Sequence, residues 1–409
     1  MAIYAITGSI RERPFSNPKK KEAVIEIIYA RKPLPASYKK SIFLAGPTPR
    51  SVGVRSWRPD AIRALEVAGY DGVVFDPEDE KYDSLSNLEK DEQIQWEHKC
   101  LDRADCILFW IPRDLVTMPA LTTNVEFGLY VNSGRVVLGA PPEAPKNYYL
   151  RFVARKERIP EADTLTGTVD LALKMIGEGA YREAAECEIP LNIWRTPYFQ
   201  SWYTKLKSAG HRLDGAKVQW VCRAGKEKHF LYAWALHMNI HVAGENRNKT
   251  NEVVVARPDI SSVLLYRRAT DWLDSRVVLV REFRSPACND GGFIWELPGG
   301  SSKDQTDWLT TAVNEVHEET GLELDRQRFQ KIETRQLIGP FSSHRANLFA
   351  VELTEEELSK LETQRGIAYG DKADYGGEMT YVEVWRLRDI LSGSLVDWSQ
   401  VGMILSVLR

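Results

Sequence analysis

Three glutamates in the last third of the chain have the spacing of a metal-binding helix. Glu315, Glu318 and Glu319 follow the glycine turn Gly299–Gly300, and Gly321 comes shortly after them. Residues three and four apart share a helical face, so the carboxylates should converge on one point. Converging carboxylates suit Mg²⁺, which prefers oxygen ligands and often bridges to substrate phosphates, and they also suit Mn²⁺. The pattern predicts a site that cleaves diphosphates with the help of a divalent cation.

This stretch resembles the Nudix box, the signature of a family that hydrolyses nucleoside diphosphate derivatives. Aligned on Gly321, the chain matches the family motif at Gly300, Glu315, Val316, Glu318, Glu319, Gly321 and Leu322. It departs at Thr306, which replaces a glutamate, and at Asn314, which replaces an arginine. The resemblance implies catalysis by Glu315 and metal ligation by the backbone carbonyl of Gly299 and by Glu315, Glu318 and Glu319. An exposed glutamate-rich helix with a glycine cap is the alternative.

Flanking segments extend the resemblance to the ADP-ribose pyrophosphatase branch of the Nudix hydrolases. They are VVLVREFRSPACNDGGFIWELPGG before the helix and LIGPFSSHRANLFAVELT after it. The branch implies a further catalytic acid from a late loop, and Glu378 aligns best with it. Arg281 and Arg284 are candidates to hold phosphates, or equally to pair with Glu282 and its neighbours.

In the first half of the chain, Glu126 and Glu97 are of the residue type that cleaves an N-glycosidic bond. Breaking a C1′–N bond builds oxocarbenium character on the sugar, and a carboxylate can attack or stabilise that carbon. A second acid at the base helps it leave by protonation or hydrogen bonding. If water completes the reaction the protein is a hydrolase, and if another base does it is a transferase.

The segments around these glutamates resemble the nucleoside 2-deoxyribosyltransferase family over about residues 41 to 150. They are IFLAGPTPR, QWEHKCLDRADCILFWIPR and TTNVEFGLYVNSGRVVLGAP. The resemblance implies that Glu126 is the nucleophile and that Glu97 contacts the base. Thr123 and Glu126 also fit a capping box, so the start of a helix is an alternative explanation for this glutamate. Ala120 stands where the transferases carry aspartate and some nucleotide hydrolases serine, which argues against assuming a nucleoside transferase.

The same resemblance implies a set of substrate-binding residues: Phe43, Gly46, Arg50, Arg58 and Asn147. Phe43 stands where some members carry a tyrosine. Arg50 and Arg58 suit phosphate through charge-assisted hydrogen bonds, and a surface position on a loop would explain them equally. Asn147 falls where family members reach a neighbouring active site, which implies a homo-oligomer.

Strands and helices must alternate to position these residues. Short apolar runs predict strands over 42–45, 73–75, 106–111 and 135–138, and periodic segments predict helices over 58–67, 88–104 and 124–132. This alternation predicts an α/β fold with a doubly wound parallel sheet. Ligands of such sheets bind outside the carboxyl ends of the strands, where we expect Glu126.

At 409 residues the chain exceeds what one hydrophobic core usually supports. We expect an N-terminal arm at 1–40, a nucleoside 2-deoxyribosyltransferase-like domain at 41–175, a helical and aromatic connector at 176–215, and an α+β Nudix domain at 216–409. Aromatic residues crowd positions 194–203, which predicts a connector that packs against a core.

Composition argues against several classes of protein. The net charge is −3 and no basic stripe indicates DNA or RNA as a partner. No apolar stretch approaches the ~20 residues of a membrane helix, and the first residues lack a signal-peptide pattern. Five scattered cysteines without a CxxC pair predict a cytoplasmic protein without a zinc site.

Two functions are favoured over a third possibility, an assembly module without activity, because Glu126, Glu315, Glu318 and Glu319 are all present. In the first, both domains are enzymes: one acts on an N-glycosidic bond, and the other hydrolyses the diphosphate of a compound such as ADP-ribose. In the second, the departures at Thr306 and Asn314 leave the Nudix domain as a weakly catalytic nucleotide sensor. It would then regulate an N-terminal nucleotide or NAD glycohydrolase.

Overall fold

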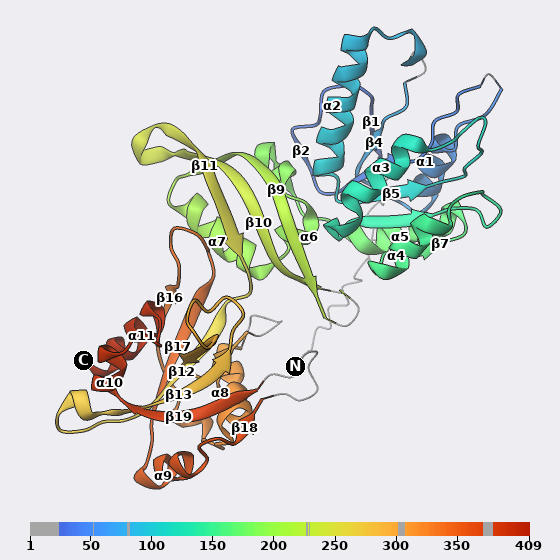
Figure 1. Cartoon of the computed structure of the whole chain (residues 1–409). Helices are drawn as coiled ribbons and strands as arrows, with labels where there is room; N and C mark the ends of the chain where they lie inside the picture. The colour runs from blue at the N-terminus through green and yellow to red at the C-terminus, as the bar shows by residue number, and fades with distance from the viewer. Residues whose placement is uncertain are drawn as a thin grey trace, which may run out of the picture.

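The structure, a computed structural model, describes residues 24–51, 53–79, 82–225, 228, 230–301, 307–370 and 379–409. Their strands form a six-stranded parallel sheet, a three-stranded antiparallel sheet, an eight-stranded mixed sheet, and the small pair β2 (Ser37–Tyr38) and β8 (Arg182–Glu183). The three-stranded sheet lies between the two larger ones (Figure 1). No helix among these residues has the length and apolar character to cross a membrane.

The parallel sheet has the strand order β1-β4-β3-β5-β6-β7. Its strands are β1 (Glu26–Tyr29), β3 (Ser41–Ala45), β4 (Val73–Asp76), β5 (Cys106–Trp110), β6 (Val136–Gly139) and β7 (Glu161–Ala162). Every residue of β3 and β5 is buried, as strands covered on both faces should be. The predicted doubly wound parallel sheet is therefore present.

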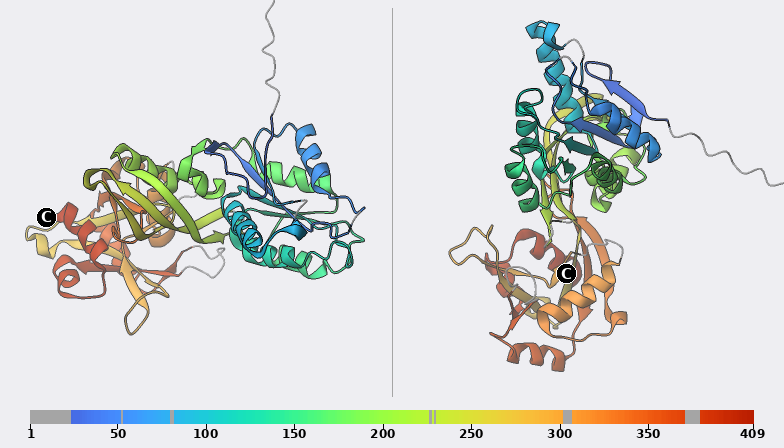
Figure 2. Two further views of the ribbon diagram at one scale, coloured as in Figure 1. Left: turned by 90° about the horizontal axis from the view of Figure 1, so that it is seen from above. Right: turned by 90° about the vertical axis from the view of Figure 1, so that its right-hand side faces the viewer.

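Helices cover both faces of this sheet (Figure 2). One face packs against α2 (Asn87–Arg103), α3 (Leu121–Tyr130) and α4 (Tyr148–Lys156), and the other against α1 (Arg58–Val67) and α5 (Leu165–Ile176). The predicted helix over 58–67 coincides with α1, whose first turn holds a proline. Strand β1 lies in the segment predicted as an N-terminal arm and pairs with β4 at the sheet edge. Residues 1–23 of the predicted arm lie outside the described residues.

The aromatic segment forms a core of its own with the three-stranded sheet. This sheet consists of β9 (Arg212–Ala224), β10 (Phe230–Val242) and β11 (Arg247–Ala256), and helices α6 (Leu191–Trp194) and α7 (Pro197–Ser208) pack on it. Phe199 and Trp234 are both fully buried, with ring centroids 5.7 Å apart. The prediction that these aromatic residues pack into a core is confirmed.

The third sheet has the order β16-β17-β12-β13-β19-β18, with β14 paired to β13 and β15 paired to β12. Its strands are β12 (Ile260–Arg267), β13 (Arg276–Phe283), β14 (Phe293–Glu296), β15 (Gly299–Gly300), β16 (Gln330–Gln336), β17 (Arg345–Glu352), β18 (Ala368–Tyr369) and β19 (Thr380–Arg386). Helices α8 (Trp308–Thr320) and α9 (Glu355–Thr363) cover one face, and α10 (Leu387–Ser392) and α11 (Trp398–Leu408) cover the other. The expected glutamate-bearing helix is α8, and it ends at Gly321 with a φ of 67°.

Candidate active site

The first candidate site lies near the carboxyl ends of the parallel strands, where α2 presents Glu97 and α3 presents Glu126. Both residues are half-buried. Burial is the main cause that raises the pKa of Glu126 to about 7, the charge of Glu97 raises it further, and Arg58 opposes the shift. Burial also raises the pKa of Glu97, while its hydrogen bond from Gln93 and the charge of Arg58 lower it. Because charges couple strongly only over short distances, these residues form one electrostatic unit.

Gln93 holds Glu97 in place and was missed by the sequence analysis. It is buried one turn before Glu97, and its Nε2 donates to Glu97 Oε1 at 3.0 Å and to the backbone oxygen of Pro77 at 3.1 Å. The signal that would have found it is the four-residue spacing from Glu97, at which side chains of a helix meet.

Arg58, expected to bind substrate phosphate, instead fastens the loop after β3. Its side chain donates to the backbone oxygens of Leu44 at 3.3 Å and Gly46 at 2.8 Å. It also faces the carboxylates of Asp76 and Glu78, each at 3.5 Å. The residue is only 1% exposed, so its role in this structure is to shape the loop and to bring a positive charge near the two glutamates.

Among the other predicted substrate-binding residues of this loop, Gly46 has a steric reason to be glycine. A Cβ at this position would overlap the backbone oxygen of Trp110 and would lie 2.6 Å from the indole of Trp57. The side chain of Arg50 is exposed, and its backbone N–H donates to the oxygen of Thr117 at 2.9 Å, which joins the loops after β3 and β5. Phe43 is buried in the core under α2 and α3, so it packs the sheet and does not line a cavity.

The capping-box explanation of Glu126 is wrong. Helix α3 begins at Leu121, and its N-cap residue Ala120 has φ 57° and no side-chain cap. Thr123 is therefore buried inside the first turn, and Glu126 lies in the second turn. The stabilisation that a helix N-terminus gives to acidic residues falls off within that first turn, so it does not account for this glutamate.

Asn147 does not reach toward another subunit. It is 5% exposed, its Oδ1 accepts from Arg113 Nε at 3.1 Å, and its Nδ2 donates to the backbone oxygen of Ile111 at 3.1 Å. Arg113 in turn donates to Asn124 Oδ1 on α3 at 2.6 Å. This network ties the loop after β5 to α3 and so helps to position Glu126.

Residues 39–144 match a family model described as "nucleoside 2-deoxyribosyltransferase like". The matched region holds β3 to β6 and both candidate glutamates, and it associates this domain with glycosyl transfer or cleavage on nucleotide-related compounds. No curated protein matches the chain in a sequence search. We refer to the matched region as the deoxyribosyltransferase-like domain.

The second candidate site lies where α8 meets the Gly299–Gly300 turn. Glu319 is 3% exposed, and its Oε2 accepts from the backbone N–H of Gly299 at 2.9 Å. A Cβ on Gly300 would overlap the carboxylate of Glu315, so this second carboxylate also lies against the turn. Glu318 is exposed on the same helix. The carboxylate of Glu315 explains glycine at position 300, and the backbone oxygen of Ser261 explains it at position 299.

The two carboxylates at this turn match the number of protein ligands with which Mg²⁺ often binds. Within the described residues, no group of three His, Cys, Asp or Glu side chains is placed to hold a metal ion. Glu378, expected to supply a further acid, lies outside those residues. Mg²⁺ often binds through one or two carboxylates together with substrate phosphates, and Glu315 and Glu319 provide that number.

The two arginines expected at phosphates both have carboxylate partners. Arg281 donates to Glu383 at 3.1 Å, and its guanidinium lies 4.7 Å from each of the ring centroids of Phe293 and Tyr381. Arg284 pairs with Glu282 at 2.9 Å and with Glu296 at 3.0 Å. The alternative explanation, pairing with Glu282 and its neighbours, thus holds for Arg284.

Proposed function

We propose that the deoxyribosyltransferase-like domain breaks the N-glycosidic bond of a nucleoside or nucleotide, with Glu126 as nucleophile. The observation that carries the proposal is the electrostatic coupling of Glu126 to Glu97, with a Glu126 pKa of about 7. In the first step the ionised Glu126 forms a bond to C1′, and the C1′–N bond breaks with its electron pair going to the base. Glu97 supports the departing base with a proton or a hydrogen bond.

The raised pKa of Glu126 sets the pH range in which the step can begin. Burial and the charge of Glu97 raise the pKa of Glu126 to about 7, so the ionised form of Glu126 becomes the main form above neutral pH. The ionised Glu126 can then attack C1′, while Glu97, held by Gln93, assists the departing base. Water or a second base then attacks C1′ and releases the sugar from Glu126.

A substrate screen tests the proposal directly. The full chain is incubated with NAD, nucleosides, and nucleoside mono- and triphosphates, and the released base is measured by chromatography. Release that requires Glu126 supports the proposal. Failure to release a base from any of these compounds overturns it.

We also propose that the C-terminal domain hydrolyses the diphosphate of a compound such as ADP-ribose. The support is the approach of Glu315 and Glu319 to the Gly299–Gly300 turn. Bound Mg²⁺ or Mn²⁺ would neutralise charge on the diphosphate oxygens. The test combines ADP-ribose with each metal. The double variant Glu318→Ala/Glu319→Ala should lose monophosphate release and keep base release.

A nucleotide sensor is the second candidate function for the C-terminal domain. Asn314 is exposed and uncharged at the position where the Nudix motif has arginine, and Arg281 and Arg284 are occupied by carboxylates. Calorimetry separates the two functions. Tight binding of ADP-ribose without turnover favours the sensor, and turnover excludes a purely regulatory role.

An exposed apolar surface supports the expectation of a homo-oligomer. Leu121, Val125 and Leu129 form a stripe on the outside of α3, and all three are more than half exposed. Tyr148 and Tyr149 are also exposed at the start of α4. Apolar surface of this extent is typical of an interface. Light scattering with Val125→Glu tests whether this surface holds subunits together.

A further inference from the structure

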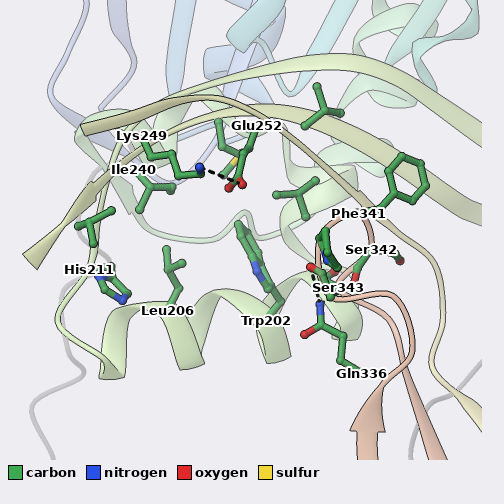
Figure 3. Close-up of a pocket in the computed structure, with 16 residues that line it drawn as sticks. Trp202, Leu206, His211, Ile240, Lys249, Glu252, Gln336, Phe341, Ser342 and Ser343 are labelled. Carbon is green, nitrogen blue, oxygen red and sulfur yellow. Dashed lines mark hydrogen bonds and ion pairs between the residues drawn. The ribbon is translucent and has the colours of Figure 1, made fainter. Parts of the chain in front are cut away.

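A cavity that none of the candidate site glutamates lines lies between α7 and the three-stranded sheet, beside segment 336–343 of the C-terminal domain (Figure 3). One side is α7, which contributes Trp202 and Leu206, and the other is the inner surface of β10 and β11. The segment 336–343, which connects β16 to β17, closes one end. The cavity measures about 260 Å³, near the lower limit of small-molecule sites.

The walls of this cavity are apolar and firmly supported. Trp202 belongs to the aromatic cluster, with its ring centroid 5.8 Å from that of Phe199 and 6.4 Å from that of Trp234. Met238 and Ile240 line the opposite side. A supported indole facing aliphatic side chains offers a slot for a flat ring, because aromatic rings prefer stacked or edge contacts with one another.

The segment that closes the cavity is itself fastened to the sheet. The backbone N–H of Val255 donates to the oxygen of Phe341 at 3.1 Å, and the N–H of Ser343 donates to the oxygen of Val255 at 3.0 Å. Arg345 donates to Ser201 Oγ on α7 at 2.7 Å and pairs with Asp259 at 2.6 Å. The cavity is therefore preformed, which lowers the ordering cost of binding.

One residue of the lining, Ser343, has an unsatisfied hydroxyl. The hydroxyl oxygen of Ser343 is buried and has no hydrogen-bond partner among the described residues. A buried hydroxyl without a partner costs free energy, and rotation of the Ser343 side chain toward a ligand in the cavity would recover it.

The charges of the lining favour a neutral ligand. Lys249 and Glu252, partly exposed at the rim, pair with each other at 3.3 Å, so their charges cancel. His211 Nδ1 accepts from the backbone N–H of Ala243 at 3.3 Å, which leaves the ring proton on Nε2. No arginine lines the cavity within the described residues. A phosphate group would therefore enter without a free cation to receive it.

From these observations we propose that the cavity is a third binding site, for an uncharged planar heterocycle of the nucleobase or nucleoside class. The ring lies against Trp202, and its polar edge meets the hydroxyl of Ser343. The site does not include the glutamates at which the two reactions are proposed. Failure of either reaction would therefore leave this binding proposal unaffected.

The test follows the Met238 methyl signal by NMR during titration of the full chain with adenine, adenosine and AMP. The chain carries Glu126→Gln so that the probes stay intact. We expect a saturable shift with adenine or adenosine, and at least tenfold weaker binding of AMP, because no free cation receives its phosphate. The titrations with adenine and with adenosine show whether the free base or the nucleoside binds more tightly. No shift with either probe, or AMP binding as tightly as adenosine, overturns the proposal.

Variants locate the site. Leu206→Trp places an indole inside the cavity and should abolish the Met238 shift, whereas Lys205→Trp, on the exposed side of the same helix, should leave it unchanged. Equal effects of the two variants contradict the placement of the ligand in this cavity.

Ser343→Ala should weaken adenosine binding about 3- to 10-fold while the free protein stays as stable as before, because the hydroxyl has no partner to lose. A loss of stability with no change in binding would show that Ser343 serves the fold alone.

Discussion

The two candidate sites place carboxylates in different surroundings. In the deoxyribosyltransferase-like domain, Glu97 and Glu126 are half-buried, burial raises the pKa of both, and the charge of Glu97 raises the pKa of Glu126 further. In the C-terminal domain, Glu319 accepts from the backbone of Gly299, and Glu318 is exposed. Surroundings of the first kind raise the pKa of a carboxyl group, and surroundings of the second kind fix carboxylate oxygens against a backbone turn. Burial and partners thus give the same residue type different properties in the two domains, which is why we propose different chemistry for them.

Glu126→Gln should give the largest effect and separate the two sites. The amide cannot attack C1′, so base release should fall at least about 1,000-fold, as it does for other lost nucleophiles. Initial rates measured by chromatography check this. Glu92→Gln, an exposed glutamate of α2, is the matched control and should keep full activity. An equal loss of diphosphate cleavage in Glu126→Gln would contradict the independence of the sites.

The pH dependence of base release should also distinguish the first candidate site from the second. Glu126 attacks only when ionised and has a pKa of about 7, so the rate should rise about tenfold per pH unit below that value and level off above it. Stopped assays of kcat/KM across this range measure the profile. A rate that is flat between about pH 5 and about pH 8 would remove Glu126 from the role of nucleophile.

Alanine at Gly46 and at Gly300 should have unequal effects on stability. A Cβ on Gly46 meets the backbone of Trp110 and a rigid indole, so the substitution should lower the free energy of unfolding by about 2–3 kcal/mol. A Cβ on Gly300 meets the end of the Glu315 side chain, which can rotate away. We expect this variant to stay nearly as stable and to lose metal-dependent activity. Urea denaturation tests the difference, and equal costs would contradict it.

Within the C-terminal site, Glu319 and Glu318 should differ in their effect on folding. Glu319→Ala leaves the N–H of Gly299 without its acceptor, so the free energy of unfolding should fall by about 1–3 kcal/mol. Glu318→Ala removes an exposed side chain and should stay within about 0.5 kcal/mol of the parent protein. Thermal unfolding without metal checks both, and a large loss in Glu318→Ala would show that it is part of the fold.

Local sequence patterns predicted helices and strands correctly where a single physical property, such as burial of an apolar run, determined the structure. The apolar runs at 42–45 and 106–111 became the buried strands β3 and β5, and Pro59 predicted the start of α1. The start of α3 was missed by three residues because Ala120 adopts a left-handed conformation that its residue type does not signal. The network of Asn147, Arg113 and Asn124 that accompanies this turn joins positions far apart in the chain.

The sequence by itself determined the strand–helix alternation and the identities of the acidic residues, since both follow from residue type and spacing. Only the tertiary structure decided that Arg58 fastens a loop, that Glu126 and Glu97 share one electrostatic environment, and that a separate cavity forms beneath β10 and β11. The physical reason is that burial and charge coupling depend on distances in space between segments that are remote along the chain. Helix and strand propensities, which depend on neighbouring residues in the sequence, do not determine those distances.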